Sequence, residues 1–510
     1  MCGIVVRLGQ PSEPQAELVE RRAERLRHRG PDGQGLRCTD SAVLAHRRLS
    51  IIDIEGGAQP LIGEDGRAAL CCNGEIYNHR DLRAQLEARH RFATHSDSEV
   101  ILHLYEEKGS ECVQELDGMF AFCLVDGARV LAARDPLGIK PLYLGRDASG
   151  GTWFASEIKA LVDVCAEFQE VPPGWLYTHD QGLRPWFTPS WSTPSAPRHR
   201  FEPQAISSRL ERSVGKRLMS DVPLGVFLSG GLDSSVIAAL VRREIDELHS
   251  FAVGLEGSED LAAARAVARH LGTRHHEYVY TAQEAVAALD SVIFHLESYD
   301  PPLLRSAIPS YFVSRLAAQH VKVVLSGEGA DEAFAGYLYF RETRDADTLR
   351  RESARLLAGL HNMNLQRVDR MTMAHGLEGR VPFLDIDFLD HAMAIDPRQK
   401  LHGPRRPEKH LLRASCERLL PSEILWRAKQ EFAQGAGSEW TLRDHCEGLV
   451  SDSELQTAAE LFPEDTPESK EAFHYRRVFE RIYPGAQARL TVGRWRGALP
   501  RPDRQGVSPA

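Results

Sequence analysis

A glycine-rich loop over residues 229–235, which reads SGGLDSS, has the composition of a phosphate-binding turn. The apolar run 225–228 predicts a buried strand before it, and residues 235–243 carry helix-forming side chains after it. Two adjacent glycines let the backbone approach an anion, and the first amides of the following helix point at that anion. The loop lacks the lysine that reaches the β- and γ-phosphates in a P-loop. The pattern therefore favours pyrophosphate binding over γ-phosphoryl transfer.

A second candidate loop follows the apolar run 321–325 and reads SGEGADE over residues 326–332. Its glycines make the backbone permissive, and its carboxylates suit Mg²⁺ bound against phosphate oxygens. These carboxylates are Glu328, Asp331 and Glu332. Taken alone, the loop also fits a solvated acidic turn.

The second residue of the chain is a cysteine, followed by a small residue and an apolar run. If Met1 is removed, Cys2 carries both a thiol and a free α-amino group, whose reference pKa is about 8. Such an amine can act as the base for its own thiol near neutral pH. Taken alone, Cys2 also fits an ordinary N-terminal residue.

The composition is that of a globular protein, with 42% apolar and 26% charged residues. A chain of 510 residues predicts about two to three domains, and its net charge of −10 argues against non-specific nucleic-acid binding. No apolar run is long enough to cross a membrane, and the first residues lack a signal-peptide pattern. We therefore expect a cytoplasmic protein with no membrane partner. The odd count of nine cysteines fits reduced thiols.

Five prolines occur between residues 185 and 203, a stretch without helical or strand periodicity. This composition favours an extended connector. Strand-like and helical segments alternate after it, which predicts a mostly parallel sheet with ligands at the carboxyl ends of its strands. We predict a first domain at 1–188, a linker at 189–203, a second domain at 204–495 and a disordered tail at 496–510.

Several motifs of the first domain occur in a fixed order: MCGI at 1–4, RGPD at 29–32, HRRLSIID at 46–53, NGEIYN at 73–78 and SDSE at 96–99. Together they resemble the glutaminase domain of class II, N-terminal-nucleophile amidotransferases. The resemblance implies an αββα sandwich in which Cys2 attacks the glutamine carboxamide and ammonia leaves. It further implies an oxyanion site at Asn73 and Gly74, a carboxylate-binding Arg48, and an α-ammonium site at Asp97 and Glu75.

The second half carries DVPLG at 221–225, SFAVGL at 250–255, VLSGEGADE at 324–332, GYLYF at 336–340, EGRVPFLD at 378–385 and RAKQEF at 427–432. With the first half, these motifs resemble the B-type, glutamine-hydrolysing asparagine synthetases. The resemblance implies an α/β ATP-pyrophosphatase domain of the adenine nucleotide alpha hydrolase type, with added helices. It implies that a carboxylate attacks the α-phosphorus of ATP and that ammonia then displaces AMP from the acyl-adenylate.

The same resemblance implies roles for individual residues. Those expected to bind ATP are Leu228, Ser229, Gly230, Gly231, Asp233, Ser234, Val253, Ser326 and Gly327. Those expected to lie beside the acceptor substrate or the metal ion are Arg305, Glu328, Asp331 and Glu332. Asp233 and Asp331 are expected to hold Mg²⁺. Arg370 and Lys429 would neutralise the charge that develops as pyrophosphate leaves. We expect the segment from Lys429 to Gly437 to be a mobile lid, because two glycines follow the lysine.

The segment after Tyr299-Asp300 departs from the family pattern, because Pro302 and Leu303 replace two hydroxyl residues while Arg305 is kept. A pocket that loses polar donors should favour a more apolar acid. The acceptor is therefore aspartate or, as the alternative, another carboxylic acid of a specialised biosynthetic pathway. A catalytically silent relative is a third hypothesis, but Cys2 and Lys429 are intact. We expect ammonia to travel between the domains through an apolar passage beside Met119. The partners that we expect are small-molecule substrates, and homodimers are common in the family.

Overall fold

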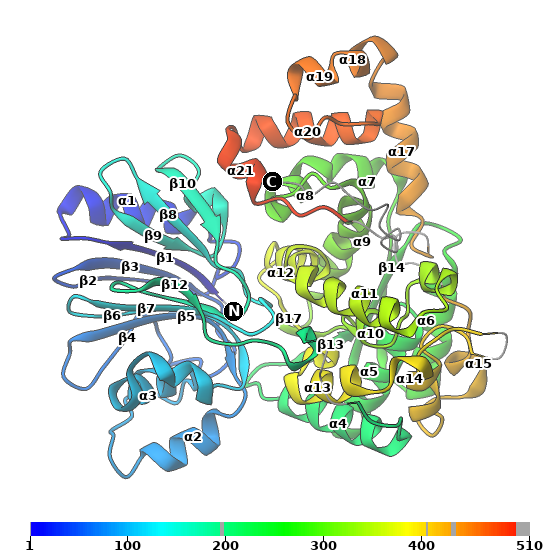
Figure 1. The fold of residues 1–510 in the computed structure, drawn as a ribbon, viewed down its shortest axis with the longest axis horizontal. Coiled ribbons are helices and arrows are strands. Elements are labelled where there is room, and N and C mark those ends of the chain that lie inside the picture. The colour runs from blue at the N-terminus through cyan, green and yellow to red at the C-terminus, as the bar shows by residue number, and fades with distance from the viewer. Residues whose placement is uncertain (1, 194–197, 404–405, 430–434, 496–510) are drawn as a thin grey trace.

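The computed structural model describes residues 2–193, 198–403, 406–429 and 435–495. These residues form two lobes that lie side by side, one built from residues 2–185 and the other from the helices and strands that follow residue 203 (Figure 1). The predicted disordered tail, and residues 194–197 of the predicted linker, lie outside the described residues.

The first lobe contains two stacked antiparallel sheets of six strands, in the orders β10-β8-β9-β1-β3-β2 and β12-β11-β7-β6-β5-β4. The strands are β1 (Cys2–Leu8), β2 (Gly33–Cys38), β3 (Ala42–Arg48), β4 (Leu61–Ile62), β5 (Ala68–Ile76), β6 (Gly118–Asp126), β7 (Arg129–Arg134), β8 (Tyr143–Asp147), β9 (Thr152–Ala155), β10 (Cys165–Glu170), β11 (Trp175–Thr178) and β12 (Gly182–Pro185).

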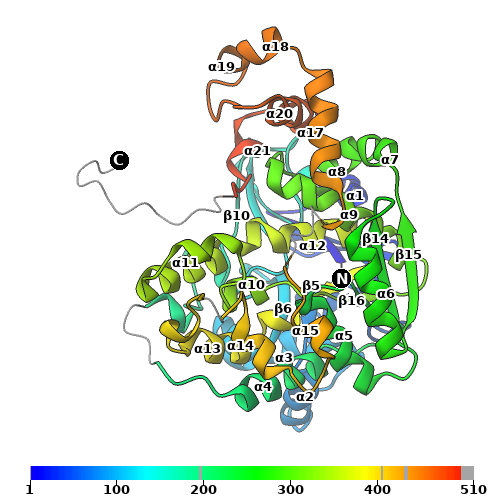
Figure 2. The ribbon, with the colours of Figure 1, turned by 90° about the vertical axis from the view of Figure 1, so that its right-hand side faces the viewer.

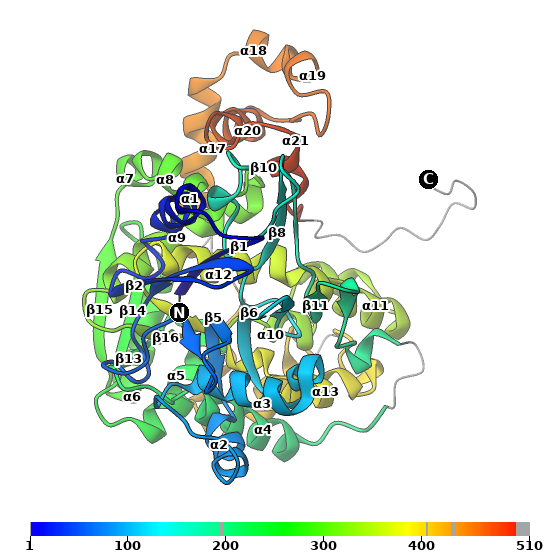
Figure 3. The same cartoon turned by 90° about the vertical axis from the view of Figure 1, so that its left-hand side faces the viewer.

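Helices cover the outer faces of this sandwich (Figures 1 and 3). Helix α1 (Glu13–Glu24) packs on β1 and β3, whereas α3 (Val100–Lys108) packs on β5 and against α2 (His79–Leu86). Every residue of β1 is buried, because one face of the strand meets the other sheet and the other face meets α1. The first lobe therefore has the four-layer αββα arrangement that the sequence predicts.

The second lobe is built on a five-stranded parallel sheet in the order β15-β14-β13-β16-β17. Its strands are β13 (Leu224–Phe227), β14 (His249–Gly254), β15 (Arg274–Val279), β16 (Val323–Leu325) and β17 (Glu378–Arg380). The chain runs from β13 to one edge of the sheet and then returns to β16 on the other side of β13. Ligands bind at such a reversal, outside the carboxyl ends of the strands. The predicted α/β fold with a parallel sheet is confirmed.

Helices pack on both faces of this sheet and extend beyond it (Figure 2). They are α4 (Pro203–Lys216), α5 (Leu232–Glu244), α6 (Glu259–Leu271), α7 (Ala282–Ala287), α8 (Leu289–Leu296), α9 (Pro301–Ala317), α10 (Ala330–Ala333), α11 (Ala346–Gly359), α12 (Asn364–Met373), α13 (Ile386–Ala394), α14 (His410–Ser415), α15 (Ser422–Leu425), α17 (Ser438–Leu449), α18 (Asp452–Gln456), α19 (Ala458–Leu461), α20 (Lys470–Ile482) and α21 (Ala486–Leu490). None of these described helices has both the length and the apolar content required to span a bilayer.

The two lobes share an apolar core. Leu49, Ile51 and Met119 of the first lobe belong to the same buried cluster as Leu224 and Val226 of the second. Part of the predicted linker also packs there, since Trp191 is 5% exposed within this cluster. The lobes are therefore held in a defined relative position.

Candidate active sites

The first candidate site lies where β1 begins. Cys2 is opposite Arg48 in the β1–β3 register, and the backbone N–H of Cys2 donates a 2.9 Å hydrogen bond to Oδ1 of Asn73 on β5. The other end of this side chain, Nδ2 of Asn73, is buried and has no hydrogen-bond partner in the described part of the chain. A buried donor that is left free beside a cysteine is suited to an oxyanion that forms only during reaction.

Gly74 follows Asn73 at a point where β5 and β6 approach closely. A Cβ atom at this position would lie 2.1 Å from the carbonyl oxygen of Met119. Any side chain here would force the strands apart. The glycine therefore preserves the position of Asn73 and of its own amide.

His46 on β3 was not predicted as a site residue, although it lies in the HRRLSIID motif. Burial by itself raises the pKa of the Cys2 thiol, but the nearby His46 imidazole is among the groups that outweigh burial and lower it to about 6. The Nε2 atom of His46 lies 3.2 Å from the carbonyl oxygen of Cys72, whereas its Nδ1 atom is buried without a partner among the described residues. The sequence signal that could have identified His46 is its position two residues before Arg48 on the same strand.

Two buried carboxylates, Glu75 and Asp97, lie beside this site. Oδ2 of Asp97 accepts a 2.6 Å hydrogen bond from the amide of Ile76, and an oxygen of Glu75 lies 3.5 Å from the guanidinium of Arg380 on β17. Burial raises the pKa of both carboxyl groups, and repulsion from Glu378 adds to it. A positively charged ammonium group bound here would reduce the repulsion among these carboxylates. The position therefore suits the α-ammonium group of glutamine, as the resemblance predicts.

Arg48 is held by a loop. Its guanidinium donates to the carbonyl oxygens of Ile52, Asp53 and Ile54, at 3.2, 2.6 and 2.9 Å. These bonds order the loop next to the site. The contact of Arg48 with a glutamine carboxylate stays a prediction.

The second candidate site is a cavity of about 360 Å³ at the carboxyl ends of β13, β14 and β16. Of the nine residues predicted to bind ATP, eight line it: Leu228, Ser229, Gly231, Asp233, Ser234, Val253, Ser326 and Gly327. Gly230 supports the turn from behind instead. It has φ +72°, and a Cβ atom there would lie 2.5 Å from Ala263 of α6.

The glycine-rich loop is stabilised by its own serines. Oγ of Ser229 accepts a 3.3 Å hydrogen bond from the amide of Gly231 and lies 3.1 Å from Oγ of Ser234. Helix α5 begins directly after Gly231, so its first amides open onto the cavity. This geometry is that of an anion site.

Two aspartates and two lysines meet at the floor of the cavity. Nζ of Lys409 lies 2.6 Å from an oxygen of Asp233 and 2.9 Å from one of Asp331, and Lys429 also contacts Asp331. The attraction of the lysines outweighs burial and lowers the pKa of Asp331. The second oxygen of Asp233, Oδ1, is buried without a partner among the described residues.

The comparisons with known proteins cover both lobes. The glutamine amidotransferase domain family matches residues 1–179, and the asparagine synthase family matches residues 205–345 and 341–499. The chain belongs to the asparagine synthase family. An Arabidopsis thaliana protein named asparagine synthetase [glutamine-hydrolyzing] 2 is 46% identical over 96% of this chain and 89% of its own length. A probable asparagine synthetase [glutamine-hydrolyzing] of Dictyostelium discoideum is 45% identical over 97% and 96%.

In this member of the asparagine synthase family, Arg370 is not among the residues that line the cavity, and its role on the phosphates stays a prediction. Arg370 is 1% exposed and bonds Glu297 at 3.1 Å, with Glu157 of the first lobe also at 3.1 Å. Arg367, three residues earlier on α12, faces the cavity instead and bonds Glu328 at 2.5 Å. The sequence motif could not decide which arginine of the helix faces the cavity.

Arg305 is likewise not among the residues that line the cavity, and its role on the acceptor stays a prediction. The segment 301–317 is a helix, α9, in which Asp300 caps the first turn and Pro301 and Pro302 occupy it. Pro302, Leu303, Ser306 and Ser310 face the cavity. Arg305 lies on another face, where its Nε bonds Glu471 of α20 at 3.0 Å.

The remaining acidic residue of the second loop, Glu332, is buried and lines the cavity. Tyr337 donates a 2.6 Å hydrogen bond to it. Burial and the charge of Asp331 raise the pKa of Glu332 to about 7. Residues 430–434 of the predicted lid lie outside the described residues.

Sequence analysis also missed Lys409 and Arg29. Lys409 directly precedes α14, a position that carries no motif. Arg29 lies in the quoted RGPD motif, and its Nε donates a 3.0 Å hydrogen bond to the carbonyl oxygen of Cys2. The same guanidinium bonds Asp369 of the second lobe at 2.8 and 3.1 Å. Arg29 therefore ties the start of β1 to the second lobe.

Proposed function

We propose that this enzyme converts aspartate, glutamine, ATP and water into asparagine, glutamate, AMP and pyrophosphate. The observation that carries the proposal is the presence of two complementary sites in one chain. The first has a low-pKa thiol beside a free oxyanion donor, and the second has a phosphate loop beside two lysines. The similarity to named asparagine synthetases over 96–97% of the chain supports it.

In the first half-reaction, the Cys2 thiolate attacks the carboxamide carbon of glutamine. Nδ2 of Asn73 and the amide of Gly74 stabilise the oxyanion. The amide nitrogen then takes up the proton that the Cys2 thiol gave up on ionisation and leaves as ammonia, which gives a thioester. Water then releases glutamate and restores Cys2. Asp97 and Glu75 bind the α-ammonium group, while the ordered loop beside Arg48 shapes the other end of the pocket.

In the second half-reaction, an aspartate carboxylate oxygen attacks the α-phosphorus and pyrophosphate leaves. The serine loop and the amides of α5 bind the pyrophosphate. Lys409, Lys429 and Arg367 compensate the negative charge that develops on it. Ammonia then attacks the β-aspartyl-adenylate and displaces AMP.

The unpartnered oxygen of Asp233 and the carboxylate of Asp331 fit a Mg²⁺ ion, which prefers oxygen ligands. When bound, the ion would neutralise phosphate oxygens of ATP. In its absence, Lys409 holds both carboxylates in place.

Aspartate is the acceptor that we propose, and α9 supports it. Pro302 and Leu303 line the cavity, as do Ser306 and Ser310 on the same face of the helix. The hydroxyls of both serines donate to helix carbonyl oxygens, that of Ser306 to Leu303 and that of Ser310 to Ser306, each at 2.9 Å. Each serine therefore offers the cavity an acceptor oxygen, which suits the ammonium group of aspartate. The names of the relatives give no support to a different acid.

Ammonia must pass between the sites as the neutral molecule. The shared apolar cluster that contains Leu49, Ile51 and Met119 supports a passage there, because it offers no partner that would favour the ammonium ion. A cytoplasmic location and a homodimer remain predictions from the sequence.

The deciding experiment measures pyrophosphate release from ATP and Mg²⁺ with ammonia as the nitrogen donor. L-Aspartate is compared with a panel of other carboxylic acids. We expect saturable release with aspartate and equimolar asparagine. Turnover with another acid and none with aspartate would contradict the proposed acceptor.

A further inference from the structure

A cluster of two histidines and two glutamates lies on the outer face of the first lobe, away from both active sites. Its members are Glu64 in the loop between β4 and β5, His90 after α2, and His103 and Glu106 on α3. One ligand atom of each lies within 4.8 Å of all the others. The mechanism uses none of these side chains.

The four atoms alternate between nitrogen and oxygen around a small closed ring. Nδ1 of His90 lies 3.1 Å from Glu64 and 3.2 Å from Glu106, and Nδ1 of His103 lies 3.6 and 3.0 Å from the same two carboxylates. Zinc binds histidine nitrogen and carboxylate oxygen at about 2.0–2.2 Å, so neighbouring ligands of a tetrahedral zinc are about 3.3–3.6 Å apart. One of the four nitrogen–oxygen separations falls in this range and the other three are shorter by about 0.1–0.3 Å, so the side chains need to move apart only slightly to take up a zinc ion.

The outer ring nitrogens face further carboxylates. Nε2 of His90 lies 3.2 Å from Glu107, and Nε2 of His103 lies 3.7 Å from Glu99. In metal sites, a carboxylate at this position orients the imidazole and raises its basicity. Packing also holds the rings, because His103 meets Phe92 edge to face with ring centroids 4.4 Å apart.

The charges around the cluster favour a cation. Arg89 pairs with Glu107, and its Nε lies 2.6 Å from a carboxylate oxygen of that residue. The charge of Glu107 is therefore balanced, and the carboxylates of Glu64, Glu99 and Glu106 remain around the two imidazoles. A divalent ion would balance them. Calcium and magnesium prefer ligand sets made of oxygen, whereas two imidazoles with two carboxylates suit zinc.

We propose that Glu64, His90, His103 and Glu106 form a structural zinc site. Four protein ligands close the coordination shell, which is the arrangement of structural rather than catalytic zinc. The ion would clamp the β4–β5 loop and the end of α2 to α3. Because α3 directly follows the turn Asp97–Glu99, the same clamp would hold Asp97 at the glutaminase site.

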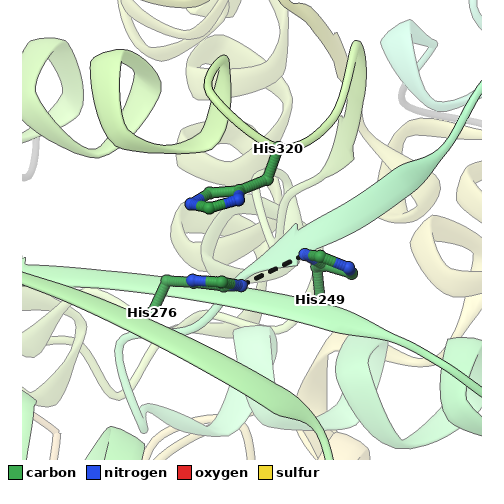
Figure 4. Close-up of side chains that lie close together, drawn as sticks. All are labelled: His249, His276 and His320. Atoms are coloured by element: carbon green, nitrogen blue, oxygen red, sulfur yellow. Dashed lines mark hydrogen bonds between the residues drawn. The ribbon is translucent and has the colours of Figure 1, made fainter.

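A second histidine cluster provides the matched control. His249, His276 and His320 also approach one another at the edge of the second lobe's sheet (Figure 4). His276 and His320 stack face to face with ring centroids 4.0 Å apart, and Nε2 of His276 lies 3.1 Å from Nδ1 of His249. No carboxylate belongs to this group, so it differs from the first cluster in lacking negative charge.

The test uses the full-length chain without an affinity tag, stripped of metal with a chelator and titrated with Zn²⁺ against a chromogenic competitor. We expect one tightly bound zinc per chain. Glu106→Gln should weaken it by at least about 10–100-fold, the loss that follows even when an outer partner is changed. His276→Asn should leave the affinity unchanged.

X-ray absorption of the zinc-loaded protein gives an independent readout of the ligands. We expect the zinc to have two imidazole nitrogens and two oxygens as ligands. In thermal unfolding, zinc should raise the Tm of the parent and of His276→Asn but not that of Glu106→Gln. Binding no stronger than that of the competitor would mean that the cluster is only an ion-pair network and would overturn the site. A sulfur ligand, or binding that survives Glu106→Gln unchanged, would place the zinc elsewhere and overturn it equally.

Discussion

At the scale of single residues, the first site depends on atoms that are left without partners. Asn73 uses its oxygen to bind the backbone of Cys2 and keeps its buried Nδ2 free. Burying a free donor is unfavourable in the resting protein. In the proposed reaction this cost is compensated when the oxyanion forms, so Asn73 would stabilise the transition state more than the ground state.

Asn73→Ala should lower glutamine-dependent kcat by about 10²–10³, because one oxyanion donor is lost. Ammonia-dependent asparagine formation should be unchanged, since that reaction bypasses Cys2. Cys2→Ala serves as the reference variant and should abolish only the glutamine-dependent activity. Parallel loss of both activities in either variant would contradict this division of labour.

His46→Gln should raise the pKa of the Cys2 thiol from about 6 toward its reference of about 8.5. The thiolate is the reactive form, so the parent should react with iodoacetamide down to about pH 6, whereas the variant should lose reactivity at a higher pH. The rate of alkylation as a function of pH measures the midpoint. An unchanged midpoint would show that His46 does not set the thiol pKa.

At the scale of elements, helix α12 serves both lobes. Arg367 lines the ATP cavity, while Arg370, nearly one turn later, is buried among Glu157, Glu297 and the backbone of the first lobe. Residues three apart lie on adjacent stripes of a helix, so one helix can meet two different surfaces. Its orientation therefore links nucleotide binding to the contact between lobes.

Arg370→Met should destabilise the protein by about 3–5 kcal/mol, because it leaves buried carboxylates without one of their partners. Arg367→Met should lower ATP-dependent pyrophosphate release with a much smaller change in unfolding free energy. Denaturant unfolding and the ammonia-dependent assay distinguish the two variants. If Arg367→Met were the more destabilising and Arg370→Met the less active, the assignment of the two faces would be reversed.

At the scale of the whole molecule, the two sites are joined by a buried interface of mixed character. Charged contacts, such as Arg29 with Asp369, surround an apolar cluster that contains Met119. The charged pairs orient the lobes. In the proposed function, neutral ammonia crosses at the apolar cluster, where no polar group would hold it as ammonium.

Met119→Gln places hydrogen-bonding groups in this cluster. We expect it to uncouple the sites, so that the ratio of glutamate to asparagine rises above the value near one expected of the parent. Retention of ammonia-dependent synthesis controls for folding, and ¹⁵N-labelled glutamine in unlabelled ammonium reports leakage. A ratio that stays at the parental value would argue against a passage beside Met119.

The sequence by itself determined the local parts of this protein: the glycine-rich loop at 229–235, the acidic loop at 326–332 and the strand–helix alternation of the second lobe. Each depends on residues that are close in the chain, where glycine geometry and strand or helix periodicity act directly. Cys2 and Asn73 lie 71 positions apart, and only the resemblance of their motifs to a known family paired them as candidate site residues. Only the tertiary structure decided that Arg367 rather than Arg370 faces the cavity, that Arg305 turns toward Glu471, and that Lys409 and His46 join the sites. These outcomes depend on the rotation of a helix about its axis and on the docking of distant segments. The physical reason is that a contact between residues tens to hundreds of positions apart is set by packing, which no local pattern specifies.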